Sequence, residues 1–190
     1  SEMCIRDRFQ TTNAYDGAIS AWLGNQLGEA DEQFPEALSV DLVKQQGLRY
    51  GENPHQSAAF YRVPEFATPH SLVNAKQLNG KELSYNNILD TDACWTLARE
   101  FDEPAVVILK HQNPCGSATA ADVATAYDKA FACDPKSAFG GIIAVNAEVT
   151  LELVEHINEN KQFVEVLIAP SYESAALEPV SYTHLTLPTT

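Results

Sequence analysis

The chain has no run of apolar residues approaching the roughly 20 that a membrane-spanning helix needs, and its N-terminus shows no signal-peptide pattern. Basic residues are also scarce, because 12 Lys and Arg stand against 26 Asp and Glu and give a formal net charge of −14. This acidic balance disfavours nonspecific binding to nucleic acid or to an anionic membrane. It is still compatible with a local basic pocket for a single phosphate.

Regularly spaced cysteines are missing as well. The four present form no CxxC pair, so a disulfide framework and a zinc site are both disfavoured, and we expect reduced thiols in the cytoplasm. Of the 190 residues, 45% are hydrophobic and 20% are charged, which is typical of a globular protein. That length allows one large domain or two small ones.

The two ends differ in composition from the rest of the chain. Residues 1–8 (SEMCIRDR) show no apolar period, and residues 180–190 (VSYTHLTLPTT) are rich in threonine and free of acid. Both resemble adapter sequence at the edges of reading frames assembled from environmental DNA, with naturally frayed termini as the alternative. We therefore expect the natural protein to continue on both sides, and we leave both tails out of the predicted fold.

Between the tails, hydrophobic patterning predicts helices that alternate with short strands. A helix is predicted over 14–27, capped by Thr11, Thr12 and Asn13, followed by an acidic connector, a short strand near Val40 and Leu42, and a turn-rich segment over 47–62. Further helices are predicted over 87–101, 121–132 and 150–160, and buried strands over 105–109, 141–145 and 163–169, with a loop over 110–117. This alternation indicates the α/β class, with a mostly parallel sheet covered by helices.

The densest group of chemically competent residues is the segment 110–116 (KHQNPCG), directly after the strand predicted over 105–109. Open α/β sheets bind ligands outside the carboxyl ends of their strands. Lys110 and His111 offer two protonatable groups with different tasks, and a neutral imidazole would serve as a base near pH 7. Pro114 favours a turn, and Gly116 would let the backbone approach a ligand. A solvated loop at the end of a strand is the alternative.

Cys115 suggests two other chemistries. A Cys–His nucleophile pair needs an imidazole within hydrogen-bond reach and a third group that orients it, and the sequence shows neither. A zinc deaminase would need Pro-Cys-x-x-Cys and His-x-Glu. Here the second thiolate and the carboxylate are both missing, so the sequence does not predict a zinc deaminase site.

Two further segments could hold an anion. The segment 49–56 (RYGENPHQ) offers the Arg49 guanidinium as a fork for phosphate or carboxylate and Tyr50 as an amphipathic wall. The segment 136–141 (KSAFGG) places two glycines before a buried strand, without the spacing of a phosphate-binding P-loop. A polar loop and a tight entry into a strand are the respective alternatives.

Five segments in order resemble the bifunctional purine-biosynthesis family that joins an inosine monophosphate (IMP) cyclohydrolase domain to an aminoimidazole carboxamide ribonucleotide (AICAR) formyltransferase domain. They are LRYGENPHQSAAFYR, NAKQLNGKELSYNNILDTDA, VILKHQNPCG, DPKSAFGGIIAVN and FVEVLIAP. The resemblance implies that residues 9–46 end the cyclohydrolase domain and form a linker. It also implies that 47–179 form the first half of the transformylase domain, whose fold is similar to that of cytidine deaminase without its zinc.

The resemblance also implies roles for single residues. Lys110 and His111 match the catalytic Lys-His pair of the family. Residues that match or align with substrate-binding positions are Arg49, Tyr50, Phe139, Gly140 and Glu165, where Glu165 has a longer side chain than the Asp of some relatives.

The implied reaction transfers a formyl group from 10-formyltetrahydrofolate to AICAR. Most of the folate site and the cyclohydrolase catalytic residues would lie outside this chain, so we expect the chain alone to be inactive or nearly so. A homodimer is expected for the full-length protein, and a monovalent cation is a further candidate ligand. Two alternatives stay open: a nucleotide-binding module without chemistry from a truncated gene, and a hydrolase that uses Cys115.

Overall fold

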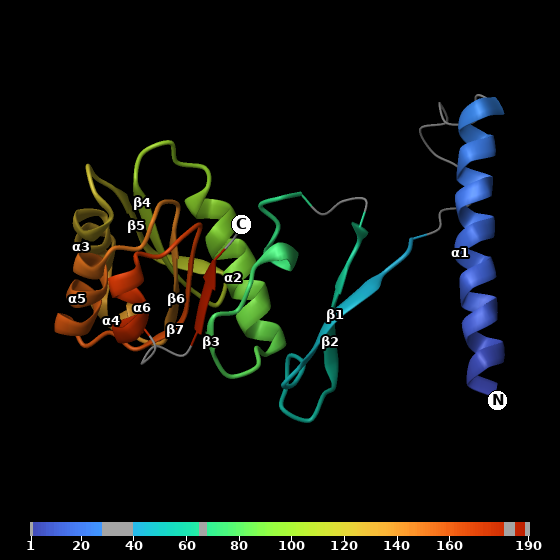
Figure 1. Ribbon diagram of the computed structural model, residues 1–190. Helices are drawn as coiled ribbons and strands as arrows, with labels where there is room; N and C mark the ends of the chain where they lie inside the picture. Colours follow the sequence, from blue (N-terminus) through green and yellow to red (C-terminus); the bar gives the residue numbers. More distant parts are fainter. Residues whose placement is uncertain (1, 28–39, 65–67, 181–184, 189–190) are drawn as a thin grey trace. The chain divides into compact units, whose positions relative to one another are not determined.

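The computed structural model of the protein describes residues 2–27, 40–64, 68–180 and 185–188 (Figure 1). The chain forms two compact units, residues 1–40 and 41–190, which are described separately. None of the helices among the described residues is long and apolar enough to cross a membrane.

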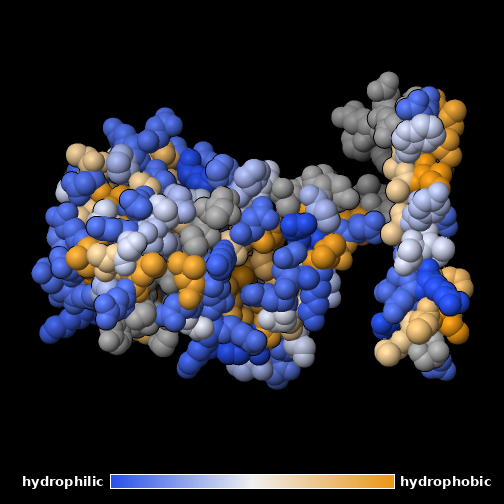
Figure 2. Space-filling model, viewed as in Figure 1, coloured by the Kyte–Doolittle hydropathy of each residue, from blue (hydrophilic) through white to orange (hydrophobic). Residues whose placement is uncertain are grey.

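The first unit contains one long helix, α1 (Glu2–Leu27). The helix was predicted to begin at Ala14 behind a cap, but it starts near the beginning of the chain because neither Pro nor Gly interrupts residues 2–13. The hydroxyls of Thr11 and Thr12 donate to the carbonyls of Asp7 and Arg8 at 2.9 and 3.0 Å, so these residues lie inside the helix instead of capping it. Apolar side chains are exposed along α1, with Trp22 61% accessible (Figure 2).

The second unit begins with an antiparallel hairpin of β1 (Val43–Leu48) and β2 (Ala58–Arg62). The strand predicted near Val40 and Leu42 therefore starts a few residues later, and the turn-rich segment contains the second strand of the hairpin. A short 3-10 helix, η3 (Leu72–Asn74), follows.

The centre of this unit is a six-stranded sheet in the order β3-β8-β7-β6-β4-β5. Its strands are β3 (Asn79–Gly80), β4 (Ala105–Lys110), β5 (Asn113–Thr119), β6 (Gly141–Val145), β7 (Val164–Ala169) and β8 (Leu185–Pro188). The pairings β6–β7 and β7–β8 are parallel, whereas β3–β8, β4–β6 and β4–β5 are antiparallel. The α/β class is confirmed, and the sheet is mixed, with its parallel part confined to β6, β7 and β8.

Both tails contribute to regular elements. Residues 2–8 are continuous with α1, and the backbone of Leu185–Pro188 pairs with β7 and β3. The prediction left both tails out of the fold, whereas the structure places these segments in a helix and a strand. An uncovered edge of β7 would expose a row of unpaired backbone groups, and β8 satisfies them.

The segment predicted as a loop over 110–117 is instead a tight turn followed by β5. Residues Asn113–Thr119 pair antiparallel with β4, and a register shift between Ile108 and Leu109 places Pro114 opposite Leu109. Pro114 and Gly116 concealed this strand in the sequence. Because β5 forms one edge of the described sheet, the missing N–H of a proline is tolerated there.

Helices cover both faces of the sheet (Figure 1). One face packs against α2 (Tyr85–Ala98) and η3, and the other against α3 (Val123–Cys133), α4 (Pro135–Ala138), α5 (Leu151–Glu159) and α6 (Ser174–Val180). In β4, Val106 and Ile108 join the core on the α3 side, whereas Val107 and Leu109 join the core on the α2 side. Burial on both faces explains why this strand is a continuous apolar run.

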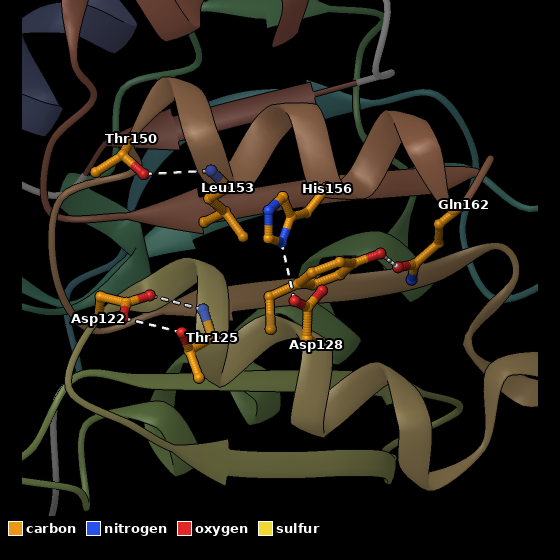
Figure 3. Close-up of polar contacts among 8 residues, drawn as sticks. Asp122, Thr125, Asp128, Thr150, Leu153, His156 and Gln162 are labelled. Carbon is orange, nitrogen blue, oxygen red and sulfur yellow. Dashed lines mark hydrogen bonds and ion pairs between the residues drawn. The ribbon is translucent and has the colours of Figure 1, made fainter.

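Side chains cap the helices on the α3 side of the sheet. Asp122 accepts from Thr125 N at 2.7 Å, and Nδ1 of His156 in α5 lies 3.0 Å from Oδ2 of Asp128 in α3 (Figure 3). Asp134 accepts from Ser137 N at 3.0 Å. Hydrogen bonds from Thr125 and from Ser137 hold the pKa values of Asp122 and Asp134 below the ordinary range of a carboxyl group.

We expect these two caps to make folding stability fall in acid. A carboxyl group with a lowered pKa in the folded state stabilises the fold while it is ionised, and this contribution is lost as the pH falls below about 4. The free energy of unfolding in urea should therefore drop less steeply between pH 6 and pH 2 in Asp122→Asn and Asp134→Asn than in the unmodified chain. Parallel curves would contradict the assignment.

Gly116 should be required for packing. A Cβ atom there would collide with the carbonyl oxygen of Ala130 in α3, so the glycine accommodates a helix and not the ligand that the sequence suggested. We expect Gly116→Ala to lower the free energy of unfolding by about 3 kcal/mol, because the added atom meets backbone that cannot turn away. The matched control is Gly47→Ala in β1, where an added Cβ meets nothing within 4 Å. An equal midpoint of urea unfolding in both variants would refute the explanation.

Candidate functional site

A pocket of about 540 Å³ opens in the second unit where β4 ends and where β6 and β7 begin. The seven residues that the sequence singled out as catalytic or substrate-binding all line it: Arg49, Tyr50, Lys110, His111, Phe139, Gly140 and Glu165. The pocket was expected at the carboxyl ends of strands. Among the described strands of the six-stranded sheet, only β4 contributes such an end, because β4 runs antiparallel to β6. Segments that are far apart in the sequence therefore meet at this pocket.

Lys110 is held at the end of β4 by the segment that precedes β6. Its Nζ donates to the carbonyl of Phe139 at 2.8 Å. The next residue, Gly140, has a φ of 73° and donates its N–H to the carbonyl of Phe163 at 2.7 Å. A side chain at this φ would be strained, so glycine allows the turn that faces Lys110.

His111 lies in a two-residue turn between β4 and β5. Both turn residues have positive φ, 52° for His111 and 60° for Gln112, as a type I′ turn requires. The carboxylate of Asp90 in α2 accepts from His111 N at 3.2 Å and from Gln112 N at 3.0 Å. The Asn113 side chain donates to the His111 carbonyl at 2.9 Å, so Asn113 shapes the turn.

Arg49 and Tyr50 enter the pocket from the loop after β1. The Arg49 guanidinium lies 4.8 Å from the centre of the Tyr50 ring, and Nη2 donates to the Tyr50 hydroxyl at 3.1 Å. Backbone hydrogen bonds join Arg49 N to the Leu83 carbonyl at 3.0 Å and Tyr85 N to the Tyr50 carbonyl at 3.2 Å. The loop is therefore tied to the start of α2.

Glu165 faces the same start of α2. Asn87 Nδ2 donates to Glu165 Oε2 at 2.7 Å, and Asn87 Oδ1 accepts from the backbone N–H of Ser84 at 3.1 Å in a capping box. Sequence reasoning missed both Ser84 and Asn87, which line the pocket. A Ser-x-x-Asn box was the available pattern, and it is weaker than the usual box with Glu or Gln.

Aromatic rings form another part of the wall. Phe139 and Phe163 have ring centres 5.7 Å apart at an interplanar angle of 38°, and both line the pocket. Phe139 is 58% exposed and Phe163 is 37% exposed. Such partly open rings can pack against a planar heteroaromatic ligand.

The charges at the pocket differ from those of the chain as a whole. The pocket contains three of the 12 basic residues of the chain, Arg49, Lys81 and Lys110. It also contains three carboxylates, Glu82, Asp90 and Glu165. The net charge of the chain is −14, so this local balance is comparatively basic. The pocket can therefore hold an anionic group in spite of the acidic composition.

A buried polar chain supports the segment before β6 from behind. The Tyr127 hydroxyl donates to Gln162 Oε1 at 2.7 Å, and Gln162 Nε2 donates to the Ala138 carbonyl at 3.0 Å. Burial raises the pKa of Tyr127, so its hydroxyl stays protonated and remains a donor. These contacts fix the backbone directly before Phe139 and Gly140.

The other candidates from the sequence do not join the pocket. Cys115 packs against the core on the α3 side, and burial raises the pKa of its thiol, which opposes activation as a nucleophile. Ser137 hydrogen-bonds Asp134 as a helix cap. Within the described residues, no three or more His, Cys, Asp or Glu side chains form a group that could hold a metal ion.

We expect Tyr127→Phe to destabilise the unit, because it leaves Gln162 Oε1 without its buried donor. The expected loss in the free energy of unfolding is about 1–2 kcal/mol in urea. Tyr61→Phe is the matched control, since Tyr61 is 46% exposed and should lose little. Equal stability of the two variants would show that the buried chain contributes nothing.

Comparison with known proteins identifies relatives over most of the chain. Residues 2–184 match the family model described as AICARFT/IMPCHase bienzyme. Proteins named bifunctional purine biosynthesis protein PurH from Bacillus cytotoxicus, Bacillus cereus and Bacillus mycoides are 51% identical over 170 residues, which is 90% of this chain and 32% of each relative. The chain thus spans about a third of the length of these relatives. On these matches, it belongs to the AICARFT/IMPCHase bienzyme family.

Proposed function

We propose that this chain is part of an enzyme that transfers a formyl group from 10-formyltetrahydrofolate to AICAR in purine biosynthesis. The whole protein would also be an IMP cyclohydrolase, with residues 9–46 at the end of that domain and 47–179 in the transformylase domain. The observation that carries the proposal is the convergence of seven residues, chosen from the sequence and its family resemblance, on one pocket of about 540 Å³.

In the proposed binding mode, basic side chains of the pocket hold the phosphate of the ribonucleotide. Arg49 offers a guanidinium fork, and Lys81 also lines the pocket. Phe139 and Phe163 would pack against the planar imidazole carboxamide, and Glu165 would accept a hydrogen bond from the ligand. The Asn87–Glu165 hydrogen bond of 2.7 Å orients that carboxylate.

In the proposed reaction, the 5-amino nitrogen of AICAR attacks the formyl carbon. A bond forms between these two atoms, and the bond between the formyl carbon and N10 of the folate breaks. His111 accepts the proton that the amine loses, and Lys110 stabilises the negative charge that develops and helps to protonate N10. The hydrogen bond to the Phe139 carbonyl would hold the Lys110 ammonium near the breaking bond.

Part of the machinery would lie outside this chain. The resemblance assigns most of the folate site to a following half-domain, and alignment of two substrates supplies about 7–11 kcal/mol of a barrier. We therefore expect this chain alone to bind AICAR weakly and to turn over little or not at all. A cytoplasmic homodimer is the expected form of the whole protein.

We expect His111→Ala to abolish most of the formyl transfer of the full-length protein. Loss of a positioned base costs about 10²–10⁴-fold in kcat, and a folate absorbance assay with AICAR measures it. His156→Ala is the matched control, because His156 pairs with Asp128 away from the pocket and should leave kcat unchanged.

Unchanged kcat in His111→Ala would remove His111 from the reaction. AICAR binding without formyl transfer in the longest natural chain would replace the enzyme by a binding module. Titration of this chain with AICAR, followed by backbone amide NMR, tests the pocket separately.

A further inference from the structure

We infer that Asp90 is a positioning residue for His111. The inference rests on the proposed function, because it assigns to Asp90 the task of fixing where the catalytic imidazole enters the pocket. It concerns a residue outside the Lys-His motif, 21 positions earlier in the sequence and on a different element.

The carboxylate of Asp90 makes one contact with each residue of the turn. Oδ2 accepts from His111 N at 3.2 Å, and Oδ1 accepts from Gln112 N at 3.0 Å. Both oxygens are thus directed at the backbone of the turn. Asp90 lies in the second turn of α2, a helix whose start is capped by the box of Ser84 and Asn87, so the acceptor is mounted on a rigid element.

The turn needs such an anchor. Two consecutive residues other than glycine have positive φ here, and type I′ turns strongly prefer Asn and Gly at these positions. A backbone in this region persists only where its surroundings hold it. The charge-assisted hydrogen bonds that the Asp90 carboxylate accepts, and the 2.9 Å bond from Asn113 to the His111 carbonyl, provide that restraint.

The contact pattern leaves the imidazole free for chemistry. Asp90 is bonded to the His111 backbone, and both residues line the same pocket. A fixed Cα–Cβ direction limits where the ring can go, which is the requirement for a base that must meet one proton. Asp90 therefore acts through His111 and does not itself need to touch the substrate.

The first test uses the 190-residue chain and needs neither ligand nor activity. Amide hydrogen exchange of His111 and Gln112, followed by NMR, should accelerate about tenfold or more in Asp90→Asn and further in Asp90→Ala. Asn retains one acceptor oxygen, whereas Ala retains none. Asp92→Asn, on the same helix and outside the pocket, is the matched control and should leave both amides protected. Unchanged exchange in Asp90→Ala would overturn the inference.

The second test is a rescue. Gln112→Gly introduces the residue that a type I′ turn prefers at its second position, so it should restore the turn in Asp90→Asn. In the full-length protein, Asp90→Ala should lower kcat about 10²-fold with little change in KM for AICAR. Gln112→Gly added to Asp90→Asn should recover a large part of the kcat that Asp90→Asn loses.

The outcomes separate the two proposals. A full-length protein without formyl transfer would end the proposed function, whereas the exchange rates would still report whether Asp90 holds the turn. Faster exchange with unchanged kcat would reduce Asp90 to a structural residue and overturn its positioning role. Loss of kcat without rescue by Gln112→Gly would also contradict it, because the effect would then not pass through the turn.

Discussion

The antiparallel pairing of β4 with β6 is the constraint on which the pocket depends. It brings the end of β4, with Lys110 and His111, beside the start of β6 and, through the parallel β6–β7 pair, beside the start of β7. In a wholly parallel sheet, the end of β4 and the starts of β6 and β7 would lie at opposite ends of the strands. The reversal therefore lets a strand end, a strand entry at Gly140 and a side chain at Glu165 face one space.

Helix α2 connects the pocket end of the sheet to the loop after β1. Its start pairs with the backbone of Arg49 and Tyr50, its capping Asn87 bonds Glu165, and its second turn carries Asp90. One apolar face of α2 is packed on the sheet through Cys94, Trp95 and Ala98. Because the same short helix is fixed by the core and contacts several lining segments, movement of α2 would displace all of them together.

How well each element was predicted from the sequence depends on the physical signal that defines it. The strand 141–145 was predicted with its observed bounds, because burial on both faces leaves an unbroken apolar run. In contrast, β5 was missed because Pro114 and Gly116 interrupt its sequence, and its pairing depends on an edge position that only the assembled sheet defines. The prediction for helix α1 is too short, because Thr11 and Thr12 resemble a cap in the sequence but bond back to carbonyls inside the helix.

For the pocket, the sequence reveals the residues in short motifs but not the residues whose partners lie far along the chain. Lys110, His111 and Arg49 were found because their side chains have chemistry that can be recognised in short motifs. Asp90 and Asn87 have ordinary side chains for a helix, and their importance lies in partners 21 and 78 positions away. A backbone with positive φ at His111 leaves no trace in residue type, since Asn or Gly would have been expected there. Asp90 and Asn87 are therefore recognised by the segments that they hold in place, and these contacts exist only in the folded chain.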